Sequence, residues 1–382
     1  KKPFSALPFA LARTQPSPPV IMPAHIAATD PYKQIPQVVG SGPFRFEPSE
    51  YVSGSRVVFS KAGGYLPRTE TPDFTAGAKR ALVERIEWRI VPDASTAANA
   101  LQAGEIDWLE SPLPDLLPLL RGNKDVVVDR LDQYGLYPVA RFNALQGPTA
   151  RLGVRQAILA AIDPVEVMQA VMGEDTTAYN APVGTFLPGT PSASTAGMDR
   201  LGGKKSIEEI KAMLAAAGYS GEKVVLLHPT DQPFYDAMTQ VVAATLQKIG
   251  VTVDDQSMDF GTVVQRRASK EPIDKGGWSI FCASFPAVDY LNPLAVPAAR
   301  GNGGKAWFGW PDDAKLETLH DQWLDTADAA EQARLAAAFQ QEVLTYAAYV
   351  PLGQYFPPTA WRRTVTGQLK GPVPVFWNIR KA

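Results

Sequence analysis

The spacing of apolar residues changes along the chain, and this change predicts where strands and helices lie. Between Phe44 and Phe59 apolar and polar residues alternate, which predicts a β-hairpin with its turn near Ser53-Gly54. The two-residue period returns from Ala81 to Val91 and predicts another strand, with its largest apolar residues on one face. The first part of the chain is therefore predicted to hold antiparallel sheet.

From Ser206 onward the pattern becomes an alternation of helices and strands. Ser206 and Glu209 have the spacing of a capping box, and Gly218 ends the helix that this box opens. The strand–helix–strand order that follows predicts parallel pairing with a right-handed crossover. Further strands are predicted over residues 126–128, 134–142, 224–228, 251–253, 278–283 and 350–356, further helices over residues 151–162, 232–249, 312–326 and 328–347, and loop with brief helical turns over residues 1–38.

Two other helices have clear boundary signals. Asp93 or Ser95 can accept hydrogen bonds from the first N–H groups of an alanine-rich helix, which Gly104 ends. Asp163 stands directly before Pro164, and proline is favoured at the first helical position. These signals predict helix ends that do not depend on tertiary packing.

Size and charge narrow the class of protein. A chain of 382 residues exceeds what one hydrophobic core supports, which predicts two domains. Apolar residues make up 45% and charged residues 20%, as in ordinary folded proteins, so disorder is excluded. A net charge of -2 speaks against a nucleic-acid partner, whose binders carry a basic excess. No apolar run approaches the length of a transmembrane helix.

The cysteine content and the first residues bear on the compartment. Cys282 is the only cysteine, which excludes an internal disulfide and a metal site built on cysteines. The sequence opens with Lys1-Lys2-Pro3-Phe4, without an initiator Met or an apolar leader region. We therefore expect that a leader, and a genuine N-terminal segment, lie outside this sequence.

No catalytic or metal-binding motif stands out. His25, His228 and His320 are far apart and lack metal-ligand spacing, so they are interpreted as solvent-exposed or capping residues. The sequence holds no nucleophile elbow, no phosphate-binding loop and no dinucleotide fingerprint. The charged residues that could be imagined as acid or base groups are interpreted as surface ion pairs: Asp107, Glu110 and Arg155 with the neighbouring Gln156. We predict no metal and no cofactor.

An aromatic-rich loop is the strongest local candidate for a binding surface. Five rings fall within 26 residues: Phe285, Tyr290, Trp307, Phe308 and Trp310. Flat rings with a few polar groups between them suit the wall of a ligand cleft. The alternative is that these rings pack beneath a long loop, and the sequence leaves both interpretations open.

Several segments, in fixed order, resemble the solute-binding proteins of the peptide/opine/nickel class of ABC importers, known as family 5. The segments are Val39-Gly40-Ser41-Gly42-Pro43-Phe44, Gly104-Glu105-Ile106-Asp107, Val154-Arg155-Gln156-Ala157-Ile158 with Ala161-Ile162-Asp163, Ala215-Ala216-Ala217-Gly218-Tyr219, and Ile249-Gly250-Val251. The segment that begins at Val154 carries most weight, because its residue types and its spacing both agree with the family pattern. The resemblance extends over nearly the whole chain, to Trp377-Asn378.

The resemblance implies an α/β fold of the periplasmic-binding-protein type II kind. Two lobes with mixed sheets would be joined by extended hinge strands and close over a ligand. Lobe I would comprise residues 1–130 and 356–382, and would lack its N-terminal part. Lobe II would comprise residues 131–355.

The resemblance also implies candidate ligand contacts. Asp289 lies where relatives place a carboxylate against a peptide α-amino group, although Val288-Asp289-Tyr290 departs from the usual Asp-Pro-Asp. Arg141 could hold a carboxylate with two parallel hydrogen bonds, or form an ion pair at a strand edge. The predicted ligand-binding residues are Tyr137, Arg141, Asn143, Asp289, Tyr290, Trp307, Trp310, Gln354 and Tyr355.

The function that the resemblance implies is reversible capture of a peptide or peptide-like solute in the periplasm and its delivery to the permease subunits of an ABC importer. The protein would act as a monomer and would not be an enzyme. Two alternatives stay open: a hydrolase that uses Asp289 with a second carboxylate, and a sensor or chaperone with the same fold. Relatives take peptides, opines, chelated nickel and sugars, so the sequence does not select the ligand.

Overall fold

The computed structural model describes residues 6–12, 20–30, 33 and 35–382, and the chain forms two compact units. Unit 1 comprises Lys1–Leu11 and Tyr134–Tyr355, and unit 2 comprises Ala12–Gln133 and Phe356–Ala382. The first residues thus group with the middle of the chain, and the buried Ala6 packs in the core of unit 1. The chain crosses from unit 2 into unit 1 at Tyr134 and returns after Tyr355.

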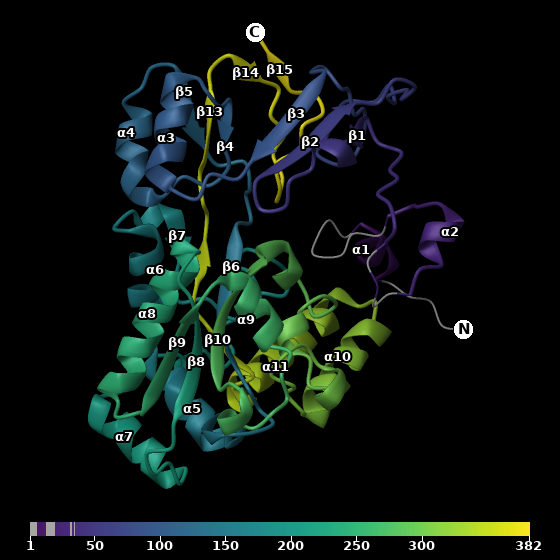
Figure 1. Cartoon of the computed structure of the whole chain (residues 1–382). Helices are drawn as coiled ribbons and strands as arrows, with labels where there is room; N and C mark the ends of the chain where they lie inside the picture. The colour runs from purple at the N-terminus through teal and green to yellow at the C-terminus, as the bar shows by residue number, and fades with distance from the viewer. Residues whose placement is uncertain (1–5, 13–19, 31–32, 34) are drawn as a thin grey trace. The chain divides into compact units, whose positions relative to one another are not determined.

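Unit 1 is built on one mixed sheet (Figure 1). Its strands run in the order β7-β12-β6-β10-β8-β9, and β11 also pairs with β6. β8 pairs in parallel with β9 and β10, whereas β10 and β6 are antiparallel. The strands are β6 (Leu136–Phe142), β7 (Tyr179–Asn180), β8 (Val224–Pro229), β9 (Val253–Met258), β10 (Ile280–Pro286), β11 (Tyr349–Pro351) and β12 (Gln354–Tyr355). The predicted mixed α/β architecture is confirmed.

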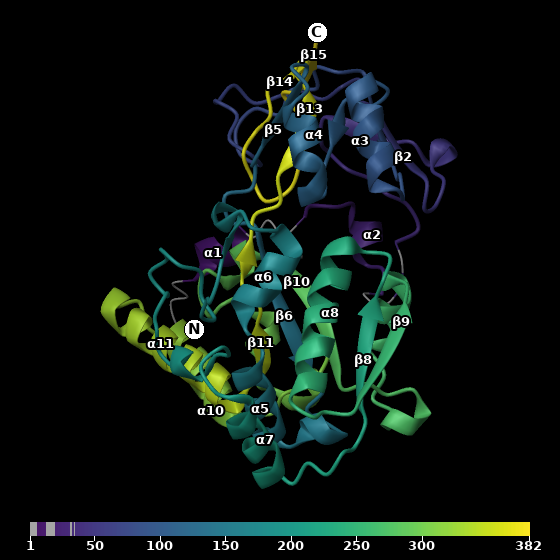
Figure 2. The ribbon, with the colours of Figure 1, turned by 90° about the vertical axis from the view of Figure 1, so that its left-hand side faces the viewer.

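Helices cover both faces of this sheet, so its central strands are buried on both sides (Figure 2). Along β6, Tyr137 and Val139 enter one apolar cluster, and Ala140 and Phe142 enter the other. This explains why β6 and β8 are almost continuously apolar. The helices are α5 (Leu152–Ala161), α6 (Pro164–Met172), α7 (Ile207–Ala216), α8 (Pro233–Lys248), α9 (Phe260–Arg266), α10 (Ala314–Asp325) and α11 (Ala329–Tyr346), with the short α1 (Leu7–Leu11) at the start of the unit.

Unit 2 contains two three-stranded sheets with smaller cores. One has the order β1-β2-β3 and the other β4-β13-β5, and all of their pairings are antiparallel. The strands are β1 (Phe44–Phe46), β2 (Arg56–Lys61), β3 (Arg85–Arg89), β4 (Trp108–Leu109), β5 (Val126–Asp129) and β13 (Thr359–Arg362), with a β14 (Val365–Thr366) and β15 (Arg380–Lys381) pair. The helices are α2 (Ala24–Ala27), α3 (Ala94–Ala103) and α4 (Leu117–Arg121).

The helix ends predicted from sequence are confirmed. The Asp93 carboxylate accepts the Thr96 N–H at 2.6 Å and starts α3, which Gly104 ends in the left-handed conformation. Asp163 caps α6, and the predicted capping box opens α7. Among the described residues, none of the helices combines the length and the apolar character needed to cross a lipid bilayer.

The predicted strand over residues 350–356 is instead two short strands, β11 and β12, separated by Gly353. This glycine has a φ of 128°, a conformation that other residues rarely adopt. A Cβ atom at this position would also lie 2.5 Å from Cγ of Met168. Backbone conformation and close packing therefore both require glycine where the chain approaches its return to unit 2.

We expect Gly353→Ala to lower the free energy of unfolding by about 3 kcal/mol, because backbone strain and overpacking against Met168 add. Gly276→Ala is the matched control, since Gly276 also has a positive φ but open space around its Cα. This control should cost about 1 kcal/mol. Denaturant unfolding of both variants measures the difference, and equal losses would contradict the packing argument.

Candidate functional site

The nine predicted site residues all lie in unit 1, where the sheet brings distant parts of the chain together. They come from four places: strand β6 and the residue after it, the 3-10 helix Ala287–Tyr290, the loop that precedes α10, and strand β12. β10 pairs with β6 and leads directly into the 3-10 helix, while β12 pairs with the start of β6. The topology thus gathers these residues around one central strand.

The two strands that link the units are tied together inside unit 1. Nε2 of Gln354 donates to the carbonyl oxygen of Tyr134 at 2.7 Å, and its Oε1 accepts from Asn180 at 2.9 Å. Tyr355 pairs with Leu136, and its buried hydroxyl lies 3.3 Å from the hydroxyl of Ser284. Gln354 and Tyr355 therefore hold the entering and leaving strands in fixed register.

Buried tyrosines form the next part of the site. The rings of Tyr137 and Tyr290 stack with centroids 3.9 Å apart, and Phe285 meets Tyr290 edge-on at 5.6 Å. The Tyr137 hydroxyl donates to the carbonyl oxygen of Gly184 at 2.5 Å. Burial raises the pKa of Tyr137 and of Tyr290 well above that of an ordinary phenol, so both stay neutral.

Arg141 is fully buried, and backbone carbonyl groups surround its guanidinium. Nε and Nη2 donate to the carbonyl oxygens of Phe308 and Trp307 at 2.5 and 3.1 Å. Nη1 donates to those of Ala298 and Ala348 at 2.6 and 3.0 Å. Four of the five N–H donors are thus engaged. Desolvation lowers the Arg141 pKa to about 10, so the group is still charged at neutral pH.

These contacts speak against both interpretations of Arg141. β6 lies inside the sheet, between β10 on one side and β11 and β12 on the other, so Arg141 is not at a strand edge. Its hydrogen-bond partners are carbonyl groups, and among the described residues no carboxylate forms an ion pair with it. A clamp on a ligand carboxylate would need two free donors, which these bonds occupy.

Asn143 and Trp310 are also held by contacts inside unit 1. The Asn143 amide donates to the carbonyl oxygen of Trp278 at 2.9 Å and accepts from the backbone N–H of Leu145 at 3.0 Å. Trp310 is buried, has a φ of 48°, and lies 6.0 Å from the ring of Trp278. Phe285, Tyr290 and Trp310 are all buried, as expected for rings that pack beneath a loop.

Trp307 differs from these rings because it is only partly buried. The guanidinium groups of Arg141 and Arg267 lie 5.4 and 5.5 Å from its ring centroid. The ring also meets Phe281 and Phe285 at 5.5 and 5.0 Å. These contacts fix a large aromatic surface in one orientation. Asp289 is 2% exposed and lies in the 3-10 helix next to Tyr290.

Three polar residues that the sequence placed at the surface are buried in the structure. His228 lies between carboxylates, with Nδ1 2.9 Å from Asp255 and Nε2 2.7 Å from Asp236. His320 is also buried, so the interpretation of both histidines as exposed or capping residues is wrong. Arg155 is buried against carbonyl groups of residues 149, 150, 346 and 347 and is no surface ion pair. Only the position of His228 in an apolar strand could have indicated its burial.

The surface interpretation holds for Asp107, whose carboxylate forms an exposed ion pair with Lys381 at 3.0 Å. In the part of the chain that the structure describes, no three His, Cys, Asp or Glu side chains come together in a way that could hold a metal ion. Cys282 is buried, and desolvation raises the pKa of its thiol to about 12.

A protein-family model matches residues 1–302 of the chain, and its description is "Bacterial extracellular solute-binding proteins, family 5 Middle". The chain belongs to solute-binding protein family 5. A relative from Sinorhizobium fredii, "Probable peptide ABC transporter periplasmic-binding protein y4tO", is 35% identical over 387 residues, which are 100% of this chain and 72% of the relative. "Heme-binding protein A" of Haemophilus influenzae is 26% identical over 87% of this chain and 58% of its own length.

Solved structures of this family share the fold. The binding protein AgaA of A. tumefaciens, in complex with agropinic acid, superposes with a TM-score of 0.72 at 19% identity, over 90% of this chain and 67% of that one. A dipeptide-binding protein from Pseudoalteromonas, in complex with Met-Leu, gives 0.71 at 20% identity, over 90% and 64%. The predicted type II binding-protein fold is thereby confirmed.

We expect Arg141→Lys to lower the free energy of unfolding by about 3 kcal/mol, because an ammonium group has fewer donors and leaves buried carbonyl groups unsatisfied. Arg334→Lys is the control, since Arg334 is exposed and pairs only with Glu331 on the same helix. This control should unfold like the parent chain. Urea denaturation compares the variants, and an equally stable Arg141→Lys variant would contradict the supporting role.

Proposed function

We propose that this chain captures a peptide or peptide-like solute outside the cytoplasmic membrane and delivers it to the permease subunits of an ABC importer. One observation carries the proposal: the chain is 35% identical over its whole length to the S. fredii protein. The name of that protein describes a periplasmic-binding protein of a peptide ABC transporter. The chain spans 58–72% of the first two relatives, so the activity is proposed for the protein of which this chain is the matched part.

Capture would depend on the two units closing around the solute as the lobes of a binding protein. The anchoring of the two connecting strands supports this proposal. Gln354 donates a hydrogen bond to Tyr134, and Tyr355 pairs with Leu136, so both strands are fixed to the sheet of unit 1. Closure would exclude water from the hydrogen bonds to the ligand, and these bonds gain strength in a low dielectric.

We infer two roles for the predicted site residues. Asp289 is proposed to pair with the ammonium group of a peptide, and Trp307 to offer its fixed ring to a side chain. The others are proposed to position these two groups and the connecting strands: Tyr137, Arg141, Asn143, Tyr290, Trp310, Gln354 and Tyr355.

The mechanism we propose makes and breaks no covalent bond, so the protein would not act as an enzyme. Its partners would be the solute and the permease, and it would act as a monomer in the periplasm. Peptides are preferred over other solutes because the S. fredii relative, 35% identical over the whole chain, has a name that specifies a peptide ABC transporter.

We expect one peptide to bind each chain without hydrolysis and to reduce the radius of gyration measured by small-angle scattering. Calorimetry and mass spectrometry with a library of di- to pentapeptides would provide the ligand. Asp289→Asn should weaken binding at least about 10-fold, because a charge-assisted hydrogen bond is lost.

The matched control for this substitution is the N-acetylated form of the same peptide, which lacks the ammonium group. Acetylation should weaken binding to the parent chain and leave the affinity of the Asp289→Asn variant unchanged. Peptide cleavage would contradict the transport proposal, and equal effects of acetylation on both chains would contradict the role of Asp289.

A further inference from the structure

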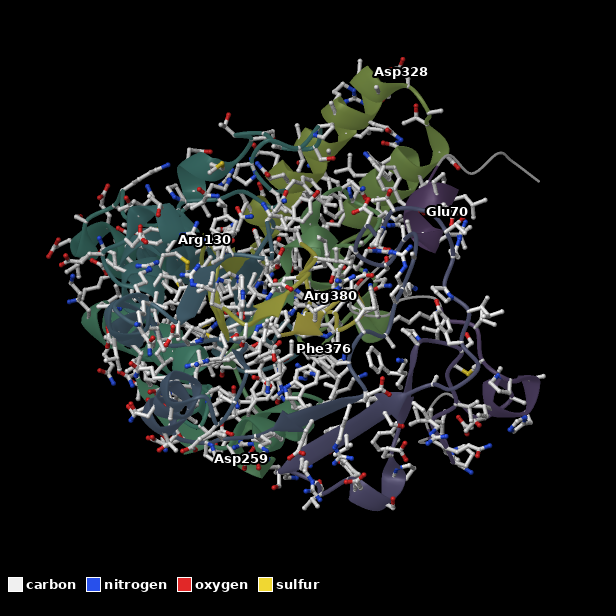
Figure 3. All side chains as sticks on the ribbon, turned by 90° about the horizontal axis from the view of Figure 1, so that it is seen from above. Glu70, Arg130, Asp259, Asp328, Phe376 and Arg380 are labelled. Carbon is white, nitrogen blue, oxygen red and sulfur yellow. The ribbon has the colours of Figure 1, made fainter. Side chains whose placement is uncertain are left out.

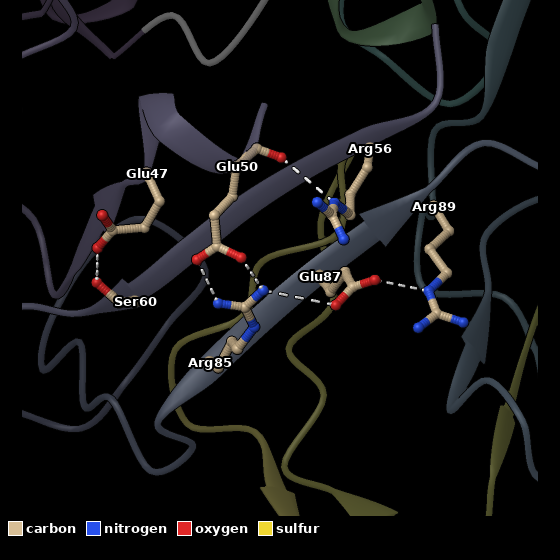
Figure 4. A network of polar contacts seen from close by, with 7 residues as sticks. All are labelled: Glu47, Glu50, Arg56, Ser60, Arg85, Glu87 and Arg89. Atoms are coloured by element: carbon tan, nitrogen blue, oxygen red, sulfur yellow. Dashed lines mark hydrogen bonds and ion pairs between the residues drawn. The ribbon is translucent and has the colours of Figure 1, made fainter. Parts of the chain in front are cut away.

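The guanidinium of Arg267 has no hydrogen-bond acceptor among the described residues, although the side chain is partly buried. Its Nε atom is buried without a partner. Arg141 and Arg155, by contrast, each donate to four backbone carbonyl groups. In unit 2, the exposed Arg85 pairs with Glu50 at 2.6 Å (Figure 4). Arg267 therefore has hydrogen-bond donors that the described part of the chain leaves unused.

The backbone of Arg267 is held in place by hydrogen bonds. Asp259, labelled in Figure 3, accepts the Thr262 N–H at 2.9 Å and starts α9. Arg267 follows the last residue of this helix, and its N–H donates to the carbonyl oxygen of Val263 at 2.9 Å. Its own carbonyl oxygen accepts from Nε1 of the buried Trp278 at 3.1 Å. The unused donors thus belong to a side chain with a fixed point of attachment.

Aromatic rings orient the side chain of Arg267. Its guanidinium lies over the ring of Phe308 at 4.7 Å and over that of Trp307 at 5.5 Å, measured to the ring centroids. Both rings are partly buried. A guanidinium that stacks on a ring keeps its N–H donors free in its own plane, where it can bind a carboxylate with two parallel hydrogen bonds. The group is therefore oriented but unpaired.

A tyrosine hydroxyl accompanies this guanidinium. Tyr235 lies in the first turn of α8, and its hydroxyl accepts the N–H of Ser284 at 3.3 Å. Within the described residues this hydroxyl donates to no acceptor. Burial raises the pKa of Tyr235, whereas the charge of Arg267 acts in the opposite direction. The hydroxyl thus keeps its proton and is a second donor.

The charge of Arg267 is not compensated by a carboxylate of the described chain. Burial lowers the pKa of the guanidinium, because the charged form loses hydration, and only the interaction with Tyr235 acts against this. Buried charges are normally paired and hydrogen-bonded. A carboxylate supplied by a bound solute would provide both.

The residues around Arg267 adjoin the contacts already proposed for the solute. Phe285 on β10 meets the ring of Trp307 at 5.0 Å and that of Tyr290 at 5.6 Å. Tyr290 directly follows Asp289 in the chain. One row of contacts within unit 1 therefore leads from Asp289 to the ring over which Arg267 lies.

We propose that Arg267 and Tyr235 bind the carboxylate of an acidic side chain in the captured peptide, with the carbon atoms of that side chain on the ring of Trp307. This inference rests on the proposed function and narrows the solute to peptides that carry glutamate or aspartate. Arg267 would form two parallel hydrogen bonds with the carboxylate, and Tyr235 would donate a third. A neutral side chain would leave the guanidinium unpaired, which makes the site selective.

Matched tripeptides test this selectivity on the 382-residue chain. Glutamate is placed first, second or third among alanines, and each peptide is compared by calorimetry with its glutamine counterpart. At one position glutamate should bind at least about 10-fold more tightly, because a charge-assisted pair is gained. Equal affinities at all three positions would overturn the proposal. Amidation of the peptide C-terminus should leave the ratio unchanged, and loss of the ratio would assign Arg267 to the terminal carboxylate instead.

Substitutions then connect the preference to one side chain. Arg267→Gln should remove the preference for glutamate and leave binding of the glutamine peptide unchanged. Lys270→Gln is the matched control, since it removes the same charge from an exposed side chain near the ring of Trp310. This control should keep the preference. A preference that survives Arg267→Gln, or that Lys270→Gln also removes, would contradict the assignment.

A conservative variant separates binding from folding. Arg267→Lys keeps the charge but lacks the planar fork, so it should reduce the preference at least about 3-fold. Urea denaturation confirms that the variants fold, and Arg267→Lys decides if Arg267→Gln does not. An unchanged preference in Arg267→Lys would overturn the two parallel hydrogen bonds.

A probe without terminal charges separates this proposal from the proposed function. N-acetylglutamate amide carries the side-chain carboxylate as its only charge, and N-acetylglutamine amide is its neutral counterpart. In NMR titrations the first should shift the Nε–H resonance of Arg267, and the second should not. Peptide binding without this shift would overturn the carboxylate site and leave peptide capture standing. The shift without binding of any peptide would support the carboxylate site and overturn peptide capture.

Discussion

The structure of unit 1 depends on a buried positive charge that is held by backbone carbonyl groups. Arg141 lies at the centre of the sheet and donates to carbonyl groups at residues 298, 307, 308 and 348. Burying a charge without compensation is costly, and several carbonyl dipoles can provide that compensation. Because these carbonyls belong to segments far apart in sequence, the same bonds fix the loop before α10 and the end of α11 to the sheet. Arg155 repeats the arrangement with four other carbonyls.

This arrangement explains how a long loop can present a rigid surface. Trp307 contributes its carbonyl to Arg141, and its ring lies against both Arg141 and Arg267. Backbone and side chain are thus fixed by the same neighbours. Preorganised rings lose little entropy when a ligand binds, which favours affinity without a large contact area.

Local signals in the sequence predicted much of the fold. Asp93, Asp163 and Ser206 cap helices through bonds to residues two or three positions away, so the sequence pattern alone is sufficient. Arg141 was not predictable in this way, because its carbonyl partners are 157 to 207 residues distant. The same holds for His228, whose partner Asp255 lies on a neighbouring strand. The family resemblance supplied the fold class, whereas tertiary contacts decided which polar residues are supporting groups.

The two units meet the requirement for backbone hydrogen bonds in different ways. Unit 1 completes one large sheet whose central strands are covered on both faces, and its buried charges are satisfied internally. Unit 2 divides its main strands between two small sheets, and residues of β3 and β4 line a cavity within the unit.

A strand edge is satisfied by water, by a partner strand or by protective charge, and the paired side chains of β3 provide no such protection. Among the described strands, β3 and β4 each pair with one neighbour, whereas Trp307 in unit 1 is held in one orientation by the residues around it. The fold itself is shared with solved binding proteins at 19–20% identity. A scaffold held by backbone carbonyls allows the side chains that face a ligand to change without loss of the fold.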